Sequence, residues 1–447
     1  MKIGKRRLGI ALVAAGALIA GAGLLLKPSP KPVPAPPVTF ASGTIQGMRE
    51  GDITVYRGIP YAAPPIGDLR WRPPQPPAKI EGVFAADHFK PVCPQIGEPL
   101  EGLGPEPMDE DCLGLNIWTP AKTGNEKLPV IVFLPGGGYV KGGGSSRLYW
   151  GGPLAQEGVV LVTVNYRIGA LGLLAHPDLS RESPDHVSGN YTLLDAIAAL
   201  RWVQANIPAF GGDPGNVTLM GHSAGAYMAS DLMTMPLAKG LFRRVIGMSG
   251  GDLGEGQMPP LPEAERKGVL FQQALGADSL EAMRRIPAMD IVAKGVAAID
   301  EEHKDYGPNR PAIDGHVLPR DARLAMTDGE GSDIALMVGC TAEEDADVLW
   351  RCKDWADLHA RPGAATWVYR FSKIPPWQKT ADHGAELPYV FGYPGNRVFF
   401  MMEAPWKAWR DARVAATMRH AWTSFAKTGD PGQADIAGFT LSRVSRP

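Results

Sequence analysis

The residues whose types and spacing could do chemistry centre on one serine. Gly221-His222-Ser223-Ala224-Gly225 fits the pattern G-x-S-x-G and follows Val217–Met220, a short run of β-branched and apolar residues. This order predicts a buried strand, a tight turn that projects the hydroxyl, and a helix that opens on small residues. Such a serine can act as a nucleophile if partner groups lie nearby. Because the chain has 54 glycines, an ordinary glycine-rich turn is the alternative.

The segments that must position this serine alternate between strands and helices from residue 128 onward. Apolar residues at helical spacing predict a helix over Leu193–Ile207. Short apolar runs predict further strands over Leu128–Leu134, Val159–Asn165, Val245–Met248, Ile334–Val338 and Thr366–Phe371. Continuous apolar runs are typical of strands that are buried on both faces, so we expect a mostly parallel sheet flanked by helices in one α/β domain.

Composition excludes several classes of function. The 447 residues carry 45 Lys and Arg against 47 Asp and Glu, a net charge of −2, so no basic footprint indicates a nucleic-acid partner. The nine histidines are scattered, and the four cysteines lack C-x-x-C spacing. We therefore predict no metal site and no cofactor.

The N-terminus has the composition of a targeting segment. Met1–Arg7 is basic, and Leu8–Leu26 is an uncharged apolar run that is long enough to cross a bilayer. The run fits either a signal peptide or a membrane anchor, and its length favours an anchor that is not cleaved. Lys27–Pro37 alternates proline with small or basic residues, which predicts an extended linker. We expect a targeting segment over 1–26, a linker over 27–37 and an extracytoplasmic folded domain over 38–447.

The cysteines bear on this location. Cys93 and Cys112 enclose an acidic, proline-rich segment without helical periodicity, and we predict a disulfide that closes it. Two free buried thiols are the alternative. Cys340 and Cys352 could form a second bridge or stay free, and the sequence leaves these two alternatives open.

Several motifs together resemble type B carboxylesterases, the family that includes the cholinesterases. The resemblance extends from about Phe40 to Pro431. The motifs are Arg57–Ala62, Glu110–Leu113, Gly136–Tyr139, Asn165–Arg167, Phe210–Pro214, Gly221–Gly225 and Phe425–Pro431. The resemblance implies an α/β-hydrolase fold with a central, mostly parallel sheet flanked by helices.

The resemblance also implies a catalytic triad. Gly339–Glu344 is similar to the family's acid segment and assigns the acid to Glu344, with Glu343 as a neighbouring candidate. The segment around His383 is similar to the family's histidine loop. In this assignment His383 takes the proton of Ser223, and Glu344 orients the imidazole.

Further positions follow from the same resemblance. The N–H groups of Gly137, Gly138 and Ala224 would form an oxyanion hole. Ser249 matches a serine that lies near the acid, although a plain serine at a strand end is equally consistent with the sequence. His222, beside the nucleophile, is predicted to be a packed turn residue rather than a second base.

The chain also departs from the family's pattern. Pro135 stands where many members have His or Tyr before the glycines. His383 follows Glu344 by only 39 positions, so a long helical insertion is missing and we expect a more open site. The segment between Cys93 and Cys112 has no aromatic residue. Since a quaternary ammonium substrate needs an aromatic cage, this absence argues against a cholinesterase.

These observations predict a serine hydrolase that cleaves carboxylic esters through an acyl-serine intermediate, with a small-molecule ester of unspecified acyl and alcohol size as its substrate. Hydrolysis of another acyl bond, in an amide, thioester or lactone, is an alternative because the same groups would serve it. A catalytically inactive binding or adhesion protein is a second alternative, although such relatives usually lack the serine or histidine that is present here.

Overall fold

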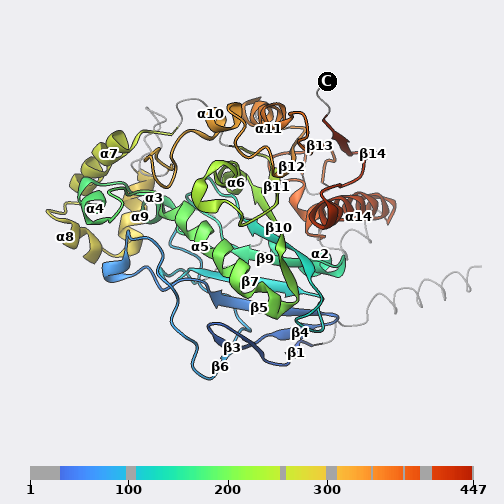
Figure 1. Cartoon of the computed structure of the whole chain (residues 1–447), viewed down its shortest axis with the longest axis horizontal. Coiled ribbons are helices and arrows are strands. Elements are labelled where there is room, and N and C mark those ends of the chain that lie inside the picture. The colour runs from blue at the N-terminus through green and yellow to red at the C-terminus, as the bar shows by residue number, and fades with distance from the viewer. Residues whose placement is uncertain are drawn as a thin grey trace, which may run out of the picture.

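A twelve-stranded sheet organises the part of the chain that the computed structural model describes, residues 31–96, 107–251, 258–297, 310–343, 346–375, 378–392 and 405–444 (Figure 1). In spatial order its strands are β1 Val33–Pro34, β4 Met48–Glu50, β5 Ile53–Pro60, β7 Gly114–Thr119, β9 Val160–Val164, β8 Leu128–Leu134, β10 Gly212–His222, β11 Arg244–Met248, β12 Ala335–Thr341, β13 Thr366–Phe371, β15 Phe439–Arg443 and β14 Ala434–Ile436. A three-stranded sheet comprises β2 Val38–Phe40, β3 Gly43–Gln46 and β6 Val83–Ala85.

The six strands in the middle of the large sheet, from β9 to β13, run parallel. The strands at both edges pair antiparallel. In register, Gly221 of β10 lies between Leu134 of β8 and Gly247 of β11. The carboxyl ends of the central strands therefore meet at one edge of the sheet, which confirms the predicted mostly parallel arrangement.

Alternate residues of the central strands pack into two different hydrophobic layers. On β8, Val130 and Val132 belong to a buried cluster with residues of α5 and α6, whereas Ile131 and Phe133 belong to a cluster with residues of α14. Successive side chains of a strand point to opposite faces, so each face of the sheet is covered. This double burial explains why the strand sequences are continuously apolar.

The helices are α2 Gly152–Gln156, α3 Gly169–Leu173, α4 Pro177–Glu182, α5 Tyr191–Asn206, α6 Ala224–Thr234, α7 Leu261–Ala274, α8 Leu280–Arg285, α9 Ala288–Ala297, α10 Ala322–Thr327, α11 Ala346–His359, α12 Leu387–Val390 and α14 Pro405–Thr428. Four 3₁₀ turns are η1 Gly67–Leu69, η2 Arg147–Tyr149, η3 Ile207–Phe210 and η4 Pro236–Ala238. Helices α7, α8 and α9 gather beside α3 and α4 at one end of the molecule (Figure 1).

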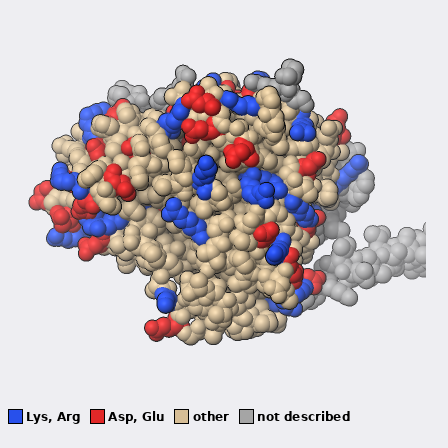
Figure 2. All heavy atoms as spheres, in the orientation of Figure 1, with Lys and Arg blue, Asp and Glu red and all other residues tan. Residues whose placement is uncertain are grey.

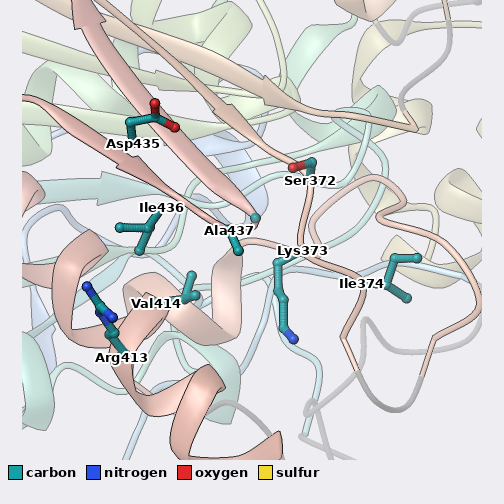
Figure 3. A pocket seen from close by; sticks show the side chains of 9 residues that line it. Ser372, Lys373, Ile374, Arg413, Val414, Asp435, Ile436 and Ala437 are labelled. Atoms are coloured by element: carbon teal, nitrogen blue, oxygen red, sulfur yellow. The ribbon is translucent and has the colours of Figure 1, made fainter.

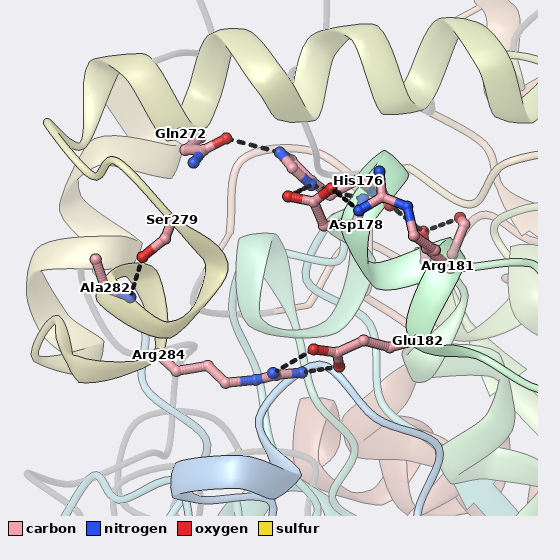
Figure 4. Close-up of polar contacts among 10 residues, drawn as sticks. His176, Asp178, Arg181, Glu182, Gln272, Ser279, Ala282 and Arg284 are labelled. Carbon is pink, nitrogen blue, oxygen red and sulfur yellow. Dashed lines mark hydrogen bonds and ion pairs between the residues drawn. The ribbon is translucent and has the colours of Figure 1, made fainter.

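Polar contacts attach this helical end to the α/β core (Figure 4). His176, which precedes α4, bonds through Nε2 to Gln272 of α7 at 2.8 Å. Arg284 of α8 donates to both carboxylate oxygens of Glu182, at 3.0 and 2.8 Å. His176 therefore has a structural role, because it links α4 to α7.

Both cysteine pairs form disulfides. Cys93 bonds to Cys112, with their Cα atoms 5.1 Å apart, which confirms the predicted bridge. Cys340 bonds to Cys352, with a Cα–Cα distance of 6.4 Å, and this bridge decides the alternative that the sequence leaves open. Disulfides persist in oxidising compartments, so the two bridges indicate an extracytoplasmic environment.

The surface and the N-terminal part bear on possible partners. On the face shown in Figure 2, acidic and basic side chains are interspersed, apart from the lower central area, which is mostly uncharged.

No helix within the described ranges is long and apolar enough to cross a bilayer. The predicted membrane segment Leu8–Leu26 lies outside the described residues. Val33 and Pro34, in the stretch predicted as a linker, pair with β4.

Candidate active site

Ser223 occupies the turn between β10 and α6, as the G-x-S-x-G pattern predicts. Its backbone has φ 53° and ψ −122°, a conformation that costs a non-glycine residue about 1–3 kcal/mol. The Ser223 N–H donates to the carbonyl of Met248 at the end of β11, at 2.9 Å. The side chain is half-buried. The turn therefore holds a strained serine within reach of a ligand at the carboxyl edge of the sheet.

The glycines of the motif are required by close backbone approaches. A Cβ on Gly221 would collide with the carbonyl of Gly225, and a Cβ on Gly225 would collide with the carbonyl of Leu134. These approaches bring α6 tightly onto the ends of β8 and β10. Larger residues at either position would displace the serine.

The glycine run after β8 lies directly against this turn. A Cβ on Gly136 would lie 2.8 Å from Cβ of Ser223, so the two backbones are adjacent. Gly137 and Gly138 adopt positive φ values of 129° and 63°, and Gly138 is exposed. The Gly137 carbonyl accepts from Val140 and Lys141 N–H groups at 3.1 Å, which folds the run into a compact turn. The predicted oxyanion-hole glycines thus lie beside Ser223.

The buried side chain of Tyr166 supports this loop. The Tyr166 hydroxyl donates to the carbonyl of Pro135, the residue that precedes the glycines. Burial raises the pKa of Tyr166 above its ordinary value, and nearby Tyr149 adds to the shift. Tyr166 therefore stays a neutral hydrogen-bond donor. Pro135, which departs from the family's pattern, still supplies the carbonyl that Tyr166 holds.

His383 is brought to the serine from a position 160 residues further along the chain. Its ring centroid lies 4.8 Å from that of His222, the residue immediately before Ser223. Two backbone hydrogen bonds fold this segment. The Ala385 N–H donates to the carbonyl of Asp382 at 2.9 Å, and the Leu387 N–H donates to the carbonyl of Gly384 at 3.1 Å. The His383 side chain is exposed. The structure thus brings two of the three predicted triad members together in one site.

The predicted acid Glu344 lies outside the described residues. The chain on either side of it is described: β12 ends at Thr341, and Cys340 is tied to α11 through Cys352. The Glu343 N–H donates to the carbonyl of Ala381 at 3.3 Å. The acid segment therefore runs beside the segment of His383.

A buried carboxylate that the sequence analysis did not single out lies next to the site. Glu386 is fully buried, three positions after His383, and accepts a hydrogen bond from the Ser249 hydroxyl at 2.8 Å. Its charge contributes, after burial, to raising the pKa of Tyr149. Ser249, predicted to lie near the acid, is thus bonded to Glu386. The sequence does carry a signal for this residue: Glu386 is an ionisable residue between Ala385 and Leu387 in the histidine loop.

His222 packs beneath His383. It is 5 % exposed, and burial together with the nearby His383 lowers its pKa well below the ordinary value. A ring that stays uncharged and enclosed agrees with the predicted packed turn residue.

The cavity shown in Figure 3 is separate from this site. It has a volume of about 710 Å³ and lies between the end of β13, β14 and α14, with Lys373, Arg413 and Asp435 among its lining residues. The Lys373 ammonium pairs with buried Asp411 at 2.8 Å. None of the predicted catalytic residues lines this cavity.

Comparison with known proteins identifies the family. The model of the Carboxylesterase family matches residues 34–355 and 346–440. The chain belongs to the carboxylesterase family. It is 38 % identical to fumonisin B1 esterase of Sphingopyxis macrogoltabida over 88 % of this chain and 82 % of that protein. It is 34 % identical to para-nitrobenzyl esterase of Bacillus subtilis (strain 168) over 88 % of this chain and 90 % of that protein.

A solved structure agrees with this assignment. A PNB esterase superposes with a TM-score of 0.80 at 30 % identity, covering 91 % of this chain and 97 % of its own. The predicted resemblance and the predicted α/β-hydrolase fold are both confirmed. By family, the protein is a carboxylic ester hydrolase.

Proposed function

We propose that the protein cleaves carboxylic esters through an acyl-serine intermediate, with Ser223 as nucleophile and His383 as base. The observation that carries the proposal is the strained Ser223 turn, with the ring of His383 packed against the adjacent His222. Positive φ at a serine between a strand and a helix is the geometry of a nucleophile in this fold. Relatives named for esterase activity on fumonisin B1 and para-nitrobenzyl esters support esters as the substrate class.

The reaction starts with proton transfer. A neutral serine is a weak nucleophile, so His383 takes the hydroxyl proton as Oγ of Ser223 attacks the ester carbonyl carbon. The carbon–oxygen π electrons move onto the carbonyl oxygen and form a tetrahedral oxyanion. The intermediate then collapses, the bond to the alcohol oxygen breaks, and the His383 imidazolium protonates the leaving alkoxide. Water, deprotonated by His383, releases the acid in the second half.

In this proposal the oxyanion accepts hydrogen bonds from Gly137, Gly138 and Ala224 N–H groups. Two observations support the assignment. The glycine run adjoins the Ser223 turn, and α6 begins at Ala224, so the positive end of an eleven-residue helix points at the developing charge. Such donors stabilise the transition state more than the neutral ester.

We assign the third triad role to Glu344. Its support is the neighbouring backbone contact between Glu343 and Ala381, which places the acid segment beside that of His383. Glu386 is the buried carboxylate nearby, and its hydrogen bond to Ser249 supports a structural role instead. A carboxylate on the imidazole fixes its tautomer and stabilises its charged form.

Turnover of a short-chain nitrophenyl ester series by the full chain tests the proposal. Ser223→Ala and His383→Ala should each abolish turnover while the fold, followed by circular dichroism, is retained. The profile across chain length would size the acyl pocket. Unchanged turnover in folded Ser223→Ala protein would contradict the mechanism.

The alternative acyl bonds need their own comparison. Matched ester and anilide substrates with the same acyl group separate an esterase from an amidase, and faster ester turnover is expected. A folded wild-type protein inert on esters, amides, thioesters and lactones alike would favour the binding protein instead.

We also propose that Leu8–Leu26 anchors the protein to a membrane with its folded domain extracytoplasmic, ahead of the linker 27–37. The disulfides and the apolar, positively flanked run support this location. Membrane fractionation of the full chain tests it. Recovery in the soluble fraction after an alkaline wash would contradict an anchor.

A further inference from the structure

Two histidines face each other beside the proposed nucleophile, and only one of them is exposed. The ring centroids of His222 and His383 are 4.8 Å apart, with an angle of 42° between their planes. His222 is enclosed, because Nδ1 lies toward Gly136 and Nε2 toward Gly384. His383 has its other side open to solvent. The imidazole of His383 therefore lies between the buried ring of His222 on one side and solvent on the other.

The surroundings of His222 disfavour a charge on its ring. Nε2 is buried and has no hydrogen-bond partner among the described residues. A protonated ring needs acceptors for both of its N–H groups, so a charged His222 would leave a donor unsatisfied in the interior. The electrostatic neighbour that acts on it is His383, whose positive form repels a second positive charge. His222 is thus held neutral by geometry as well as by burial.

Other charged groups lie on the segments around His222, and each is either exposed or bonded to another residue, or is half-buried. Asp382 is exposed and accepts from Thr380, and Glu386 accepts from Ser249. Glu343 of the acid segment is exposed, and Lys141 of the glycine loop is half-buried. Glu344 lies outside the described residues. Among the described groups, Asp382, Glu343, Glu386 and Lys141 do not act on the pKa of His222, whereas His383 lowers it.

We propose that His222 is a positioning residue for His383: its uncharged ring backs the catalytic imidazole and withholds solvation from the protonated form, which keeps His383 available as a base in mildly acidic solution. The inference rests on the proposed function of His383. A carboxylate at position 222 would have the opposite effect, because an opposite charge within about 4–6 Å stabilises an imidazolium. The residue before the nucleophile thus sets the pH range of the reaction.

The test compares wild-type protein with His222→Glu and His222→Gln. Histidines labelled with ¹³C at Cε1 are titrated by NMR in the full chain, and His383→Gln and His222→Gln assign the two signals. In wild-type protein the His222 signal should keep its neutral shift through pH 6.5, because the pKa of His222 is lowered well below its ordinary value. In His222→Glu the pKa of His383 should rise by about 1 unit or more. His222→Gln, which removes the ring but adds no charge, should raise it in the same direction by a smaller amount.

The pH at which kcat/KM for a nitrophenyl ester falls off on the acid side should rise in parallel with the pKa of His383, most of all in His222→Glu. The matched control is His359→Gln, which removes another buried histidine whose pKa burial lowers, at the C-terminal end of α11, where it bonds to Thr366 and the Ile334 carbonyl. That control should leave this pH unchanged.

Titration of His222 near pH 6.5 in wild-type protein would overturn the inference. This measurement is made on the wild-type protein, and the variants are needed only to assign its two histidine signals. An unshifted His383 pKa in folded His222→Glu protein would overturn it as well. Failure of the proposed function looks different: ester turnover would survive His383→Ala, whatever the two histidine signals do.

Discussion

Ser223 and Ser249 occupy equivalent places on neighbouring strands, yet their surroundings differ. β10 and β11 pair in parallel with His222 opposite Met248, so the two serines follow at the same level. Both have positive φ, 53° and 51°. Ser223 is half-buried and opens α6, whereas Ser249 is fully buried and donates to Glu386. The same positive φ thus occurs at two serines with different surroundings.

The difference shows which features would distinguish the proposed nucleophile, Ser223, from a structural serine. Strain at a strand end is common to both residues, so strain alone does not indicate catalysis. Ser223 differs from Ser249 in three respects. Its side chain is partly accessible to solvent, helix α6 begins directly after it, and the backbone of the glycine run lies beside it. A buried carboxylate occupies the Ser249 hydroxyl and ties the end of β11 to the histidine loop.

The largest expected effect comes from removing each hydroxyl in turn. Ser223→Ala should reduce kcat on a nitrophenyl ester by about a thousandfold or more, because the covalent step is lost. Ser249→Ala should keep kcat within about tenfold but lower the free energy of unfolding by about 1–3 kcal/mol, because buried Glu386 loses its donor. Urea unfolding supplies the second measurement. A larger kcat loss in Ser249→Ala would reverse the assignment.

The two carboxylates sharpen the comparison next. Glu344→Gln should lower kcat by about a thousandfold, because the His383 imidazolium loses its stabilising charge. Glu386→Gln can still accept from Ser249, so kcat should change by less than about tenfold. Steady-state kinetics of both variants decides between them. The opposite ranking would make Glu386 the catalytic acid.

A pair of glycines isolates the oxyanion donors. Gly138→Ala and Gly51→Ala both place a side chain at positive φ, 63° and 64°, without a clash: a Cβ at Gly51 would meet open space, and one at Gly138 would lie 3.9 Å from Val140. Each should cost about 1 kcal/mol of stability, and Gly138→Ala alone should lower kcat, by about ten- to a hundredfold, because its N–H moves. Equal kcat values in the two variants would argue against a donor at Gly138.

The smallest effect concerns pH and stability. Burial, as the main cause, lowers the pKa of both His222 and His359 below the unfolded value near 6.5. Their stabilising contribution is complete above that pH and is lost as the pH falls toward the folded-state values. The free energy of unfolding should drop by up to about 1.4 kcal/mol per pH unit for each histidine. Denaturant unfolding at pH 7.5 and 5.5 measures this drop, which should be smaller in His359→Gln; an equal drop in both proteins would contradict it.

Parts of the fold were predictable because burial on both faces leaves a sequence signal. The predicted limits of β8 and β13 match the structure residue for residue, since β8 is a continuous apolar run and β13 is apolar apart from Thr366 and Arg370. The edge strand β14, Ala434–Ile436, is short and half-exposed, and no such run marks it. Edge strands take their conformation from a neighbour rather than from their own composition.

The site divides in the same way. The Ser223 turn follows from local residues, whereas burial of Glu386 depends on Ser249, 137 positions away. Pairing of Cys340 with Cys352 likewise requires α11 to fold back on β12, which neither cysteine's neighbours indicate. Long-range contacts therefore account for what the sequence did not show. The role of Glu344 stays a prediction.

Covalent trapping tests the central claim most directly. The full chain is incubated with a nitrophenyl phosphonate, which phosphonylates an activated serine and releases nitrophenolate, and the site is mapped by peptide mass spectrometry. We predict one adduct, on Ser223, that is absent from Ser223→Ala and retained in Ser249→Ala. An adduct on Ser249, or none on Ser223 in protein that hydrolyses esters, would contradict the account.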